Sequence, residues 1–166
     1  LGRLLSHLMR AFRNADPKAV QQKALPLCVF IEVLKMQYSE TQRALGQLGL
    51  SAFYFAMRSC EYLKVPQSEK RRTQILRLRN IRFFKQGIEL PHNHPQLDTA
   101  DTISKTFEFQ KKDERNDTVT HEATGDGPLC PVINGVKLVR RIRSYPGAND
   151  DAPISAVWRN ARIEHV

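Results

Sequence analysis

The sequence is poor in cysteine and contains no long apolar run, and each absence narrows the class of protein. Its 166 residues include three cysteines, Cys28, Cys60 and Cys130, with no Cys-x-x-Cys pair. An odd count without that spacing argues against a disulfide framework and a zinc knuckle. No stretch is apolar over the length that a membrane span needs, and no signal peptide is visible. We therefore expect an intracellular protein without membrane contact, nuclear if its host is eukaryotic.

Two common catalytic signatures are also missing. The chain has no glycine-rich phosphate loop and no Gly-x-Ser-x-Gly motif, so a nucleotide hydrolase or a serine hydrolase has no support. His92 and His94 stand one residue apart, which is a weak metal pattern because no third ligand lies nearby. A polar loop is the favoured interpretation of this pair, and we expect no metal site.

Acidic residues are outnumbered, which points to a polyanionic partner. Lys and Arg total 26 against 17 Asp and Glu, giving a formal net charge of +9. A surplus of this size is most often associated with nucleic acid. The chain is 41% hydrophobic and 26% charged, a composition typical of a globular domain and not of a disordered segment. A basic interaction protein without a nucleic-acid role stays open as an alternative.

The first part of the chain predicts two helices. Residues 1–14 carry apolar side chains at helical spacing, and residues 18–24 have the composition of a linker. Pro26 fits the first turn of a second helix that continues to about Tyr38, because the missing N–H of proline is harmless there.

A strongly apolar segment over residues 41–62 follows. Ser39 precedes it as a candidate N-cap, with Gln42 at the position that reaches back to the cap. We expect one buried helix here, with a break near Gly49 as an open alternative.

The second half of the chain changes to an alternating pattern. Apolar and polar residues alternate over 75–84 and 103–110, a third short strand is expected at 118–121, and residues 111–117 form a charged hairpin turn. A further helix is expected at 130–143. The order predicts an α+β fold, mainly α, in which helices accompany a small three-stranded antiparallel sheet.

Arg58 and Glu61 form the most informative pair of charged residues. They are three residues apart, so in a helix they share a face. They end a run that is too apolar to face water, and a buried arginine must be paired or directed at an anion. Glu61 can hold the guanidinium while leaving donors for a phosphate. A purely structural ion pair is the alternative that the residues alone favour.

Lys111 and Lys112 stand at the tip of the expected hairpin. A lysine there can reach a phosphate oxygen as a mobile charge or proton donor. The alternative is a solvated turn, which is usual for so charged a segment.

Further basic residues cluster in three short stretches. Arginine and lysine side chains neutralise phosphates without reading base sequence, and Arg77 and Arg79 would lie on one face of a strand. The candidate DNA-contacting residues are Arg71, Arg72, Arg77, Arg79, Lys112, Arg140 and Arg141. An exposed salt-bridging surface is the alternative.

Taken in order, these segments resemble the catalytic domain of tyrosine recombinases, the phage-integrase-like enzymes, and among them the Crypton-type recombinases of mobile elements. The resemblance rests on the order of five segments, at residues 53–62, 72–83, 106–112, 119–122 and 129–132. It implies that residues 1–24 end a helical, SAM-like core-binding domain with its linker. Residues 25–166 would then form the N-terminal part of the catalytic domain.

The resemblance also implies roles for three residues. Arg58 corresponds to the first catalytic arginine, which binds the scissile phosphate, and Glu61 to the acidic residue that supports it. Lys111, or else Lys112, corresponds to the hairpin lysine that protonates the leaving 5′-oxygen. Such cations stabilise the charge concentrated on a phosphoryl group in transfer. The implied function is site-specific DNA recombination and integration, with double-stranded DNA as partner and no cofactor or small-molecule substrate. A homo-oligomer on DNA is compatible with the full-length protein.

The sequence departs from the family after this point. The family also has a His-x-x-Arg box and, beyond it, a nucleophilic tyrosine. No such box follows Arg58, and Tyr145 precedes the place where a box would stand. We therefore expect a truncated catalytic domain that does not cleave DNA on its own. A non-catalytic, basic nucleic-acid-binding module is the alternative function.

Overall fold

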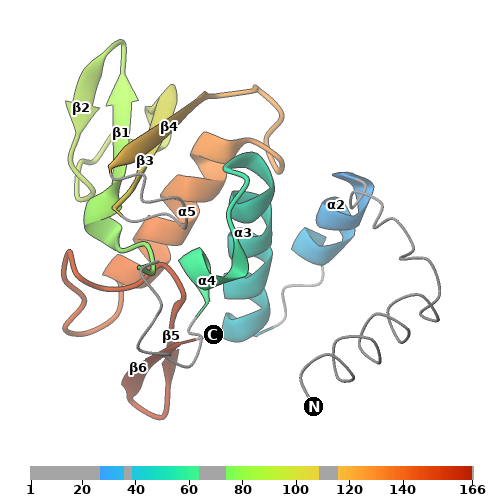
Figure 1. Cartoon of the computed structure of the whole chain (residues 1–166), viewed down its shortest axis with the longest axis vertical. Coiled ribbons are helices and arrows are strands. Elements are labelled where there is room, and N and C mark those ends of the chain that lie inside the picture. The colour runs from blue at the N-terminus through green and yellow to red at the C-terminus, as the bar shows by residue number, and fades with distance from the viewer. Residues whose placement is uncertain (1–26, 36–38, 64–73, 109–115, 166) are drawn as a thin grey trace, which may run out of the picture.

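The computed structural model describes residues 27–35, 39–63, 74–108 and 116–165, and it confirms a mixed α+β fold (Figure 1). Three of the expectations fall outside the described residues. They are the helix at residues 1–14, the pair Arg71 and Arg72, and the pair Lys111 and Lys112. In the described ranges, no helix combines the length and the apolar character needed to cross a membrane. The helices are α2 (Leu27–Lys35), α3 (Glu40–Tyr54), α4 (Ser59–Tyr62) and α5 (Pro131–Arg143), with short 3-10 helices η1 (Leu78–Asn80) and η2 (Leu97–Thr99).

The main sheet has four strands, so the expectation of three is wrong. Strands β1 (Ile81–Lys85), β2 (Ile88–Leu90), β3 (Thr102–Phe107) and β4 (Asp117–Glu122) pair antiparallel in the order β2-β1-β3-β4. The missed strand, β2, has three residues, too few to show an alternating pattern. Strands β1 and β2 are joined by Gln86 and Gly87, which both have positive φ, as in a two-residue hairpin loop.

A second, two-stranded sheet closes the described chain. Strands β5 (Ala156–Arg159) and β6 (Arg162–His165) pair antiparallel across the residues Asn160 and Ala161, which both have positive φ. The sequence pattern left this stretch unassigned. Both strands have four residues, which again is too short for a periodic signal.

The capping prediction for α3 is confirmed, whereas the expectation of one helix over residues 41–62 is wrong, because α3 ends at Tyr54 and α4 is separate. The Ser39 hydroxyl accepts the Gln42 N–H at 3.2 Å, and the Gln42 side chain accepts the Ser39 N–H at 2.9 Å. The helix runs straight through Gly49 and ends at Tyr54. Ala56 has φ of 48°, a left-handed conformation that no helix continues through, and α4 starts only at Ser59.

The core lies where α5 packs between the sheet and α3 (Figure 1). The backbone of α5 approaches β3 so closely at Gly135 that an added Cβ would overlap the Ile103 side chain. Leu48 of α3, Leu138 of α5 and Phe83 of β1 are fully buried around this contact. The helix expected at 130–143 is confirmed as α5, and Pro131 opens it, where the missing N–H of proline costs nothing. Helix α5 is therefore the element that fixes α3 relative to the sheet.

Candidate nucleic-acid interface

Arg58 and Glu61 lie together in the turn that joins α3 to α4. One Glu61 carboxylate oxygen accepts the Arg58 backbone N–H at 2.8 Å, and the other lies 3.4 Å from the Arg58 Nη1 atom. The Glu61 side chain is 4% exposed and the Arg58 side chain 48% exposed. A buried carboxylate thus fixes the base of a half-exposed guanidinium.

This geometry confirms the pairing of the two residues and corrects their placement. Arg58 is not buried and does not share a helical face with Glu61, because the chain leaves the helix after Tyr54 and Arg58 itself precedes α4. The apolar run that suggested burial does bury Phe55 and Met57, and it leaves Arg58 exposed.

Backbone hydrogen bonds from two distant segments hold this turn in place. The Leu76 N–H donates to the Glu61 carbonyl at 2.9 Å, and the Ile154 N–H donates to the Leu76 carbonyl at 3.0 Å. The ladder continues where the N–H groups of Leu78 and Arg79 donate to carbonyls of the loop that follows α5. The arginine turn is therefore part of the packed structure and not a loose connection.

The same turn packs on β3 through an unusual contact. Lys105 of β3 is fully buried, and its Nζ atom lies 4.2 Å from the centre of the Phe55 ring. The amine has no hydrogen-bond partner in the described part of the chain, and burial lowers its pKa to about 7. The sequence pattern contained the signal for this, because Lys105 stands between Ile103 and Phe107 on the apolar face of an alternating strand. The expectation did not single it out.

Arg77 and Arg79 lie next to the turn but do not share a strand face, which corrects the expectation. Of the expected strand at 75–84, only residues 81–84 belong to a strand of the sheet, and Arg77 forms an isolated bridge with Pro153. Arg79 belongs to η1, and Arg77 caps it through an Asn80 side chain that accepts the Arg77 N–H at 2.8 Å. The Asn80 side chain is what turns the backbone before β1.

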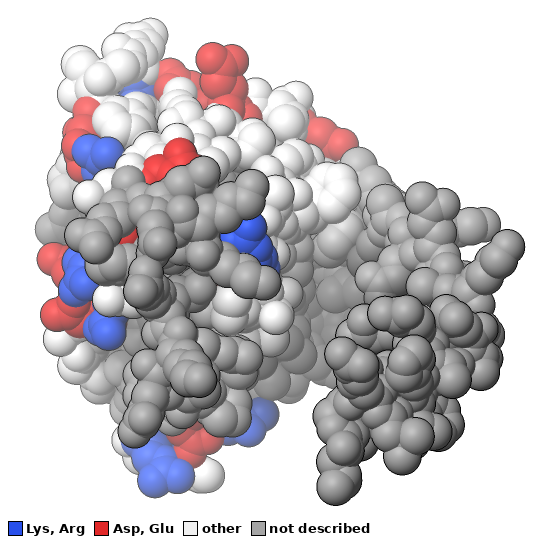
Figure 2. Space-filling model, in the orientation of Figure 1, with Lys and Arg blue, Asp and Glu red and all other residues white. Residues whose placement is uncertain are grey.

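Both of these arginines are neutralised by acidic neighbours. Arg79 contacts Glu108 at 3.0 Å and also pairs with Asp151, which lies 3.8 Å from the Arg77 guanidinium. The hydrogen bond from Arg79, followed by that from Asn80, lowers the pKa of the Glu108 carboxyl. On the described part of the surface in Figure 2, Lys and Arg side chains accordingly lie among Asp and Glu side chains.

The two candidates on α5 have different surroundings. Arg140 is exposed and pairs with Asp98 at 2.6 Å. Arg141 is 5% exposed, and its guanidinium donates to the Gln47 side chain at 2.8 Å and to the Ala156 carbonyl at 2.6 Å. Arg141 therefore lies inside the fold and not on the surface where a DNA contact was expected, because its donors join α5 to α3 and β5. The basic run looked exposed in sequence, but the helical period turns this one residue inward.

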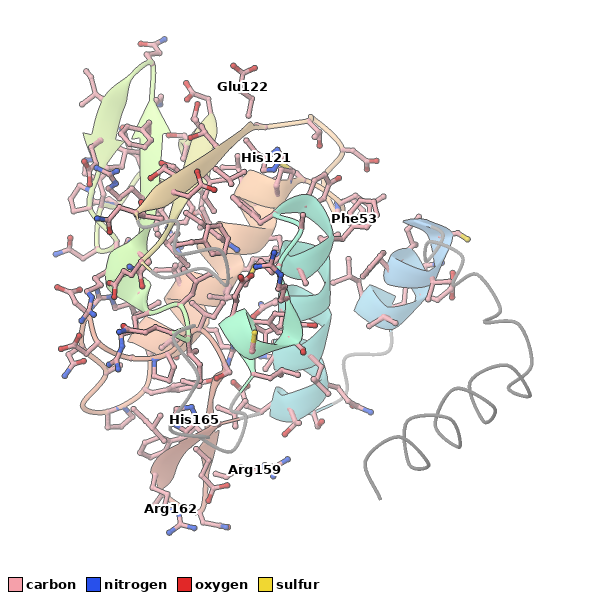
Figure 3. All side chains as sticks on the ribbon, in the orientation of Figure 1. Phe53, His121, Glu122, Arg159, Arg162 and His165 are labelled. Atoms are coloured by element: carbon pink, nitrogen blue, oxygen red, sulfur yellow. The ribbon has the colours of Figure 1, made fainter. Side chains whose placement is uncertain are left out.

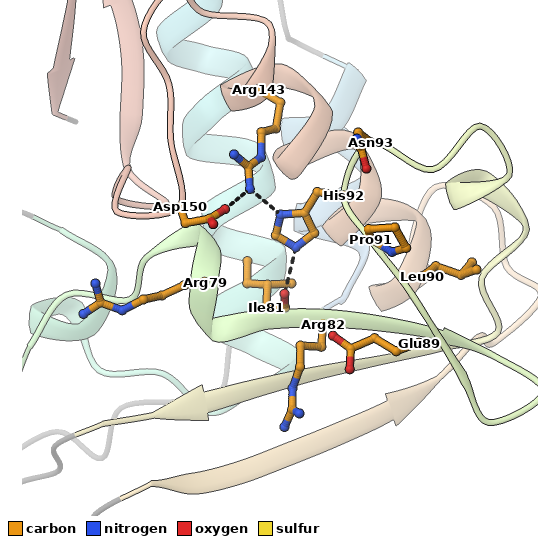
Figure 4. A pocket seen from close by; sticks show the side chains of 10 residues that line it. All are labelled: Arg79, Ile81, Arg82, Glu89, Leu90, Pro91, His92, Asn93, Arg143 and Asp150. Carbon is orange, nitrogen blue, oxygen red and sulfur yellow. Dashed lines mark hydrogen bonds and ion pairs between the residues drawn. The ribbon is translucent and has the colours of Figure 1, made fainter.

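A pocket of about 450 Å³ lies between the start of β1, the loop after β2 and the end of α5 (Figure 4). His92 lines it with both ring nitrogens engaged, since Nε2 donates to the Ile81 carbonyl at 2.8 Å and Nδ1 accepts from Arg143 at 3.1 Å. Arg143 also pairs with Asp150. His92, Arg143 and Asp150 therefore form one hydrogen-bonded group on the wall of the pocket, which the charged side chains of Arg79, Arg82 and Glu89 also line.

No group of three or more potential metal ligands is found among the described residues. His92 uses both nitrogens as stated, and the His94 Nδ1 atom accepts the Gln96 N–H at 3.1 Å. The described part of the chain thus offers no built metal centre.

The tip of the β5–β6 hairpin carries two arginines that sequence reasoning missed. Figure 3 shows Arg159 and Arg162 at the opposite end of the molecule from His121 and Glu122. Arg159 donates to the Thr41 hydroxyl at 2.6 Å, and Arg162 pairs with Glu164 at 2.8 Å. Glu164 balances the charge of Arg162, whereas the Thr41 hydroxyl is neutral and leaves the charge of Arg159 available to an anion.

Within the described residues, the geometry therefore brings Arg58 and Glu61 together and places Arg77 and Arg79 beside them. Comparisons of the chain with protein-family models, with curated proteins and with solved structures find no match.

Proposed function

We propose that this chain binds the phosphate backbone of double-stranded DNA through Arg58, with Glu61 as the residue that orients it. One observation carries the proposal: Arg58 is a half-exposed guanidinium whose ion pair, among the described residues, is with a single buried carboxylate. A guanidinium presents five N–H donors in a planar fork. The contact with Glu61 occupies one edge, so the remaining donors suit a bidentate phosphate contact.

The neighbouring arginines support this assignment by contrast. Arg77 and Arg79 share Asp151, and Arg79 is also paired with Glu108. A phosphate must compete with these carboxylates, whereas at Arg58 the carboxylate lies behind the guanidinium. We therefore assign the main phosphate contact to Arg58 and secondary contacts to Arg77, Arg79 and Arg140.

The class of activity that fits best is site-specific DNA recombination of the tyrosine-recombinase type. In that chemistry a fixed arginine stabilises the charge that develops on the scissile phosphate. Lys111 and Lys112 follow the end of β3 in the sequence and stay candidates for the hairpin lysine. Since no His-x-x-Arg box follows Arg58 in the 166 residues, the proposal covers phosphate binding and not strand cleavage. The second candidate is a non-catalytic, basic nucleic-acid-binding module.

The test is a binding titration with a fluorescent random-sequence duplex, read as anisotropy over a series of salt concentrations. Arg58→Ala is compared with Lys35→Ala, which removes an equally charged, exposed side chain paired with Glu32. We expect Arg58→Ala to weaken binding roughly tenfold and to reduce the salt slope by about one, and Lys35→Ala to change affinity less than about twofold. Far-UV circular dichroism verifies that both variants are folded.

Other results exclude the proposal or favour its alternatives. Equal losses in Arg58→Ala and Lys35→Ala would contradict a specific role for Arg58. Equal losses in Arg58→Ala, Arg77→Ala and Arg79→Ala would favour the non-catalytic basic module. Binding without steep salt dependence, or no binding at all, would favour a basic protein with no nucleic-acid role.

A further inference from the structure

Lys105 is the most anomalous side chain in the described part of the chain. It is fully buried, its amine has no hydrogen-bond partner, and it sits over the Phe55 ring at 4.2 Å. Lysine is almost never fully buried without a partner, because the charged form loses its hydration. A buried polar group that has no partner calls for a physical explanation.

Among the described residues, no ion pair or hydrogen bond compensates the charge of Lys105. In the sheet it stands opposite Ile81 of β1 and Val119 of β4. On the other side lies Phe55, whose ring is 4.7 Å from the ring of His121 of β4. The His121 Nε2 atom donates to the Tyr54 carbonyl at 2.8 Å. The ionisable groups at this contact are thus Lys105, His121 and Tyr54, with Arg58 and Glu61 following at the turn and α4.

The position of Phe55 links its contact with Lys105 to the placement of Arg58. Phe55 is three residues before Arg58, in the segment that leaves the helix through the left-handed Ala56. Lys105 therefore lies directly beneath the segment that positions the candidate phosphate-binding arginine.

We propose that the contact between Lys105 and Phe55 is controlled by a proton. The neutral amine packs under Phe55 and keeps the segment 55–58 on β3, and protonation of the amine releases that segment. The step is a simple proton uptake from solvent, and no bond other than N–H forms or breaks.

The direction of the pH dependence follows from the two states. In the packed state the pKa of Lys105 is about 7 against a usual 10.5, and in the released state the amine is solvated. Between these values release takes up a proton, so the released population grows as pH falls, by roughly tenfold per unit well above pH 7. Below about pH 7 the packed state is protonated as well, and the population levels off.

For DNA binding the inference rests on the proposed function, since only then does the position of Arg58 matter to a ligand. The proton-controlled contact itself does not depend on it. The decisive measurement therefore uses the full chain without DNA.

The experiment is backbone amide hydrogen exchange of residues 55–58, followed by mass spectrometry from about pH 6 to pH 9. The amides of Phe55, Met57 and Arg58 are hydrogen-bonded to Ser51, Ala52 and Glu61 in the packed state. Each rate is divided by that of Lys105→Met at the same pH, which cancels the intrinsic pH dependence of exchange. Met keeps the length of the side chain and removes the proton site.

We expect this ratio to rise about tenfold as pH falls from 9 to 8 and to level off below about pH 7. The same amides should exchange faster than those of α5, since release is smaller than global unfolding. His121→Gln, which retains a donor for the Tyr54 carbonyl, should leave the ratio unchanged.

Three results would overturn the inference. They are a ratio that does not vary with pH, exchange of residues 55–58 at the same rate as α5, or loss of the pH dependence in His121→Gln. If the contact is proton-controlled but the proposed function fails, the hydrogen-exchange ratio still depends on pH, while neither the parent chain nor Lys105→Met binds DNA. If both hold, Lys105→Met binds DNA with a weaker pH dependence than the parent chain.

Discussion

Glu61 contacts Arg58 twice, accepting its backbone N–H at 2.8 Å and lying 3.4 Å from its guanidinium. The first contact fixes the backbone of the turn and the second fixes the side chain. Since Glu61 is buried and Arg58 is half exposed, the pair orients the arginine without enclosing it.

Substitutions at Glu61 separate these two contacts. Glu61→Gln retains an acceptor for the Arg58 N–H and should lower the free energy of unfolding by only about 1 kcal/mol, whereas Glu61→Ala leaves that donor unsatisfied and should cost about 2–3 kcal/mol. Urea unfolding followed by far-UV circular dichroism measures both. Equal losses in the two variants would show that the backbone contact contributes nothing.

The buried Arg141 predicts a loss of stability and not of DNA affinity. Its guanidinium donates to Gln47, Tyr145 and Ala156, and the Tyr145 hydroxyl in turn contacts Glu40. Arg141→Ala should therefore cost about 3 kcal/mol of unfolding free energy. The remaining folded protein should bind duplex DNA as the parent chain does.

The matched control is Tyr145→Phe, which removes one hydroxyl of the same network and should cost about 1 kcal/mol. Burial, followed by the Glu40 contact, raises the pKa of Tyr145 to about 12, so its hydroxyl keeps its proton at neutral pH. A stable Arg141→Ala chain that binds DNA weakly would contradict this prediction.

The close approach of α5 to the sheet predicts that Gly135→Ala destabilises the fold. The new methyl group would overlap Ile103 and press on Phe83. Overpacking costs about 1–3 kcal/mol, of which better helix propensity offsets up to about 1 kcal/mol. Gly49→Ala is the control, because its nearest neighbour would be Phe30 at an ordinary 3.5 Å. In thermal unfolding, Gly49→Ala should have a clearly higher melting temperature than Gly135→Ala. The reverse order would exclude the close packing of α5 on β3 at Gly135.

His92 predicts a loss of stability in weak acid. Burial, followed by the adjacent Arg143, lowers its pKa against the opposing effect of the Ile81 carbonyl. The unfolded chain then binds a proton near pH 6.5 while the folded chain does not, so stability falls below that pH by at most about 1.4 kcal/mol per unit. It levels off once the folded histidine is also protonated.

The variant for this prediction is His92→Gln, which retains a donor toward Ile81 and should reduce the change in urea midpoint between pH 7 and pH 5. His94→Gln, in the same loop but outside the pocket, should leave that change intact. If both variants behave alike, His92 is not the group responsible.

The sequence predicted those features that depend on local chemistry. The Ser39–Gln42 capping box and the proline that opens α5 are fixed by residues within one helical turn, so a short window contains the whole cause. The pairing of Arg58 with Glu61 was predictable for the same reason.

The features that were missed depend on distant parts of the chain. Asn80 and the loop near Asp150 bend the segment before β1, and nothing in the alternation of residues 75–84 reveals them. Arg141 is buried only because α3 and β5 supply acceptors. The helix breaks at Ala56 although no glycine or proline at that position predicts a break. Tertiary contacts decided each of these positions against the local pattern.

The ladder between residues 76–79 and 150–154 has a consequence for how the molecule is made. During synthesis, Arg58 leaves the ribosome long before residues 76–79, which brace its turn, receive partners from the loop after α5. Pairing across so long a stretch of chain is slow compared with helix formation. Nascent chains should thus acquire their helices first and a rigid arginine turn late.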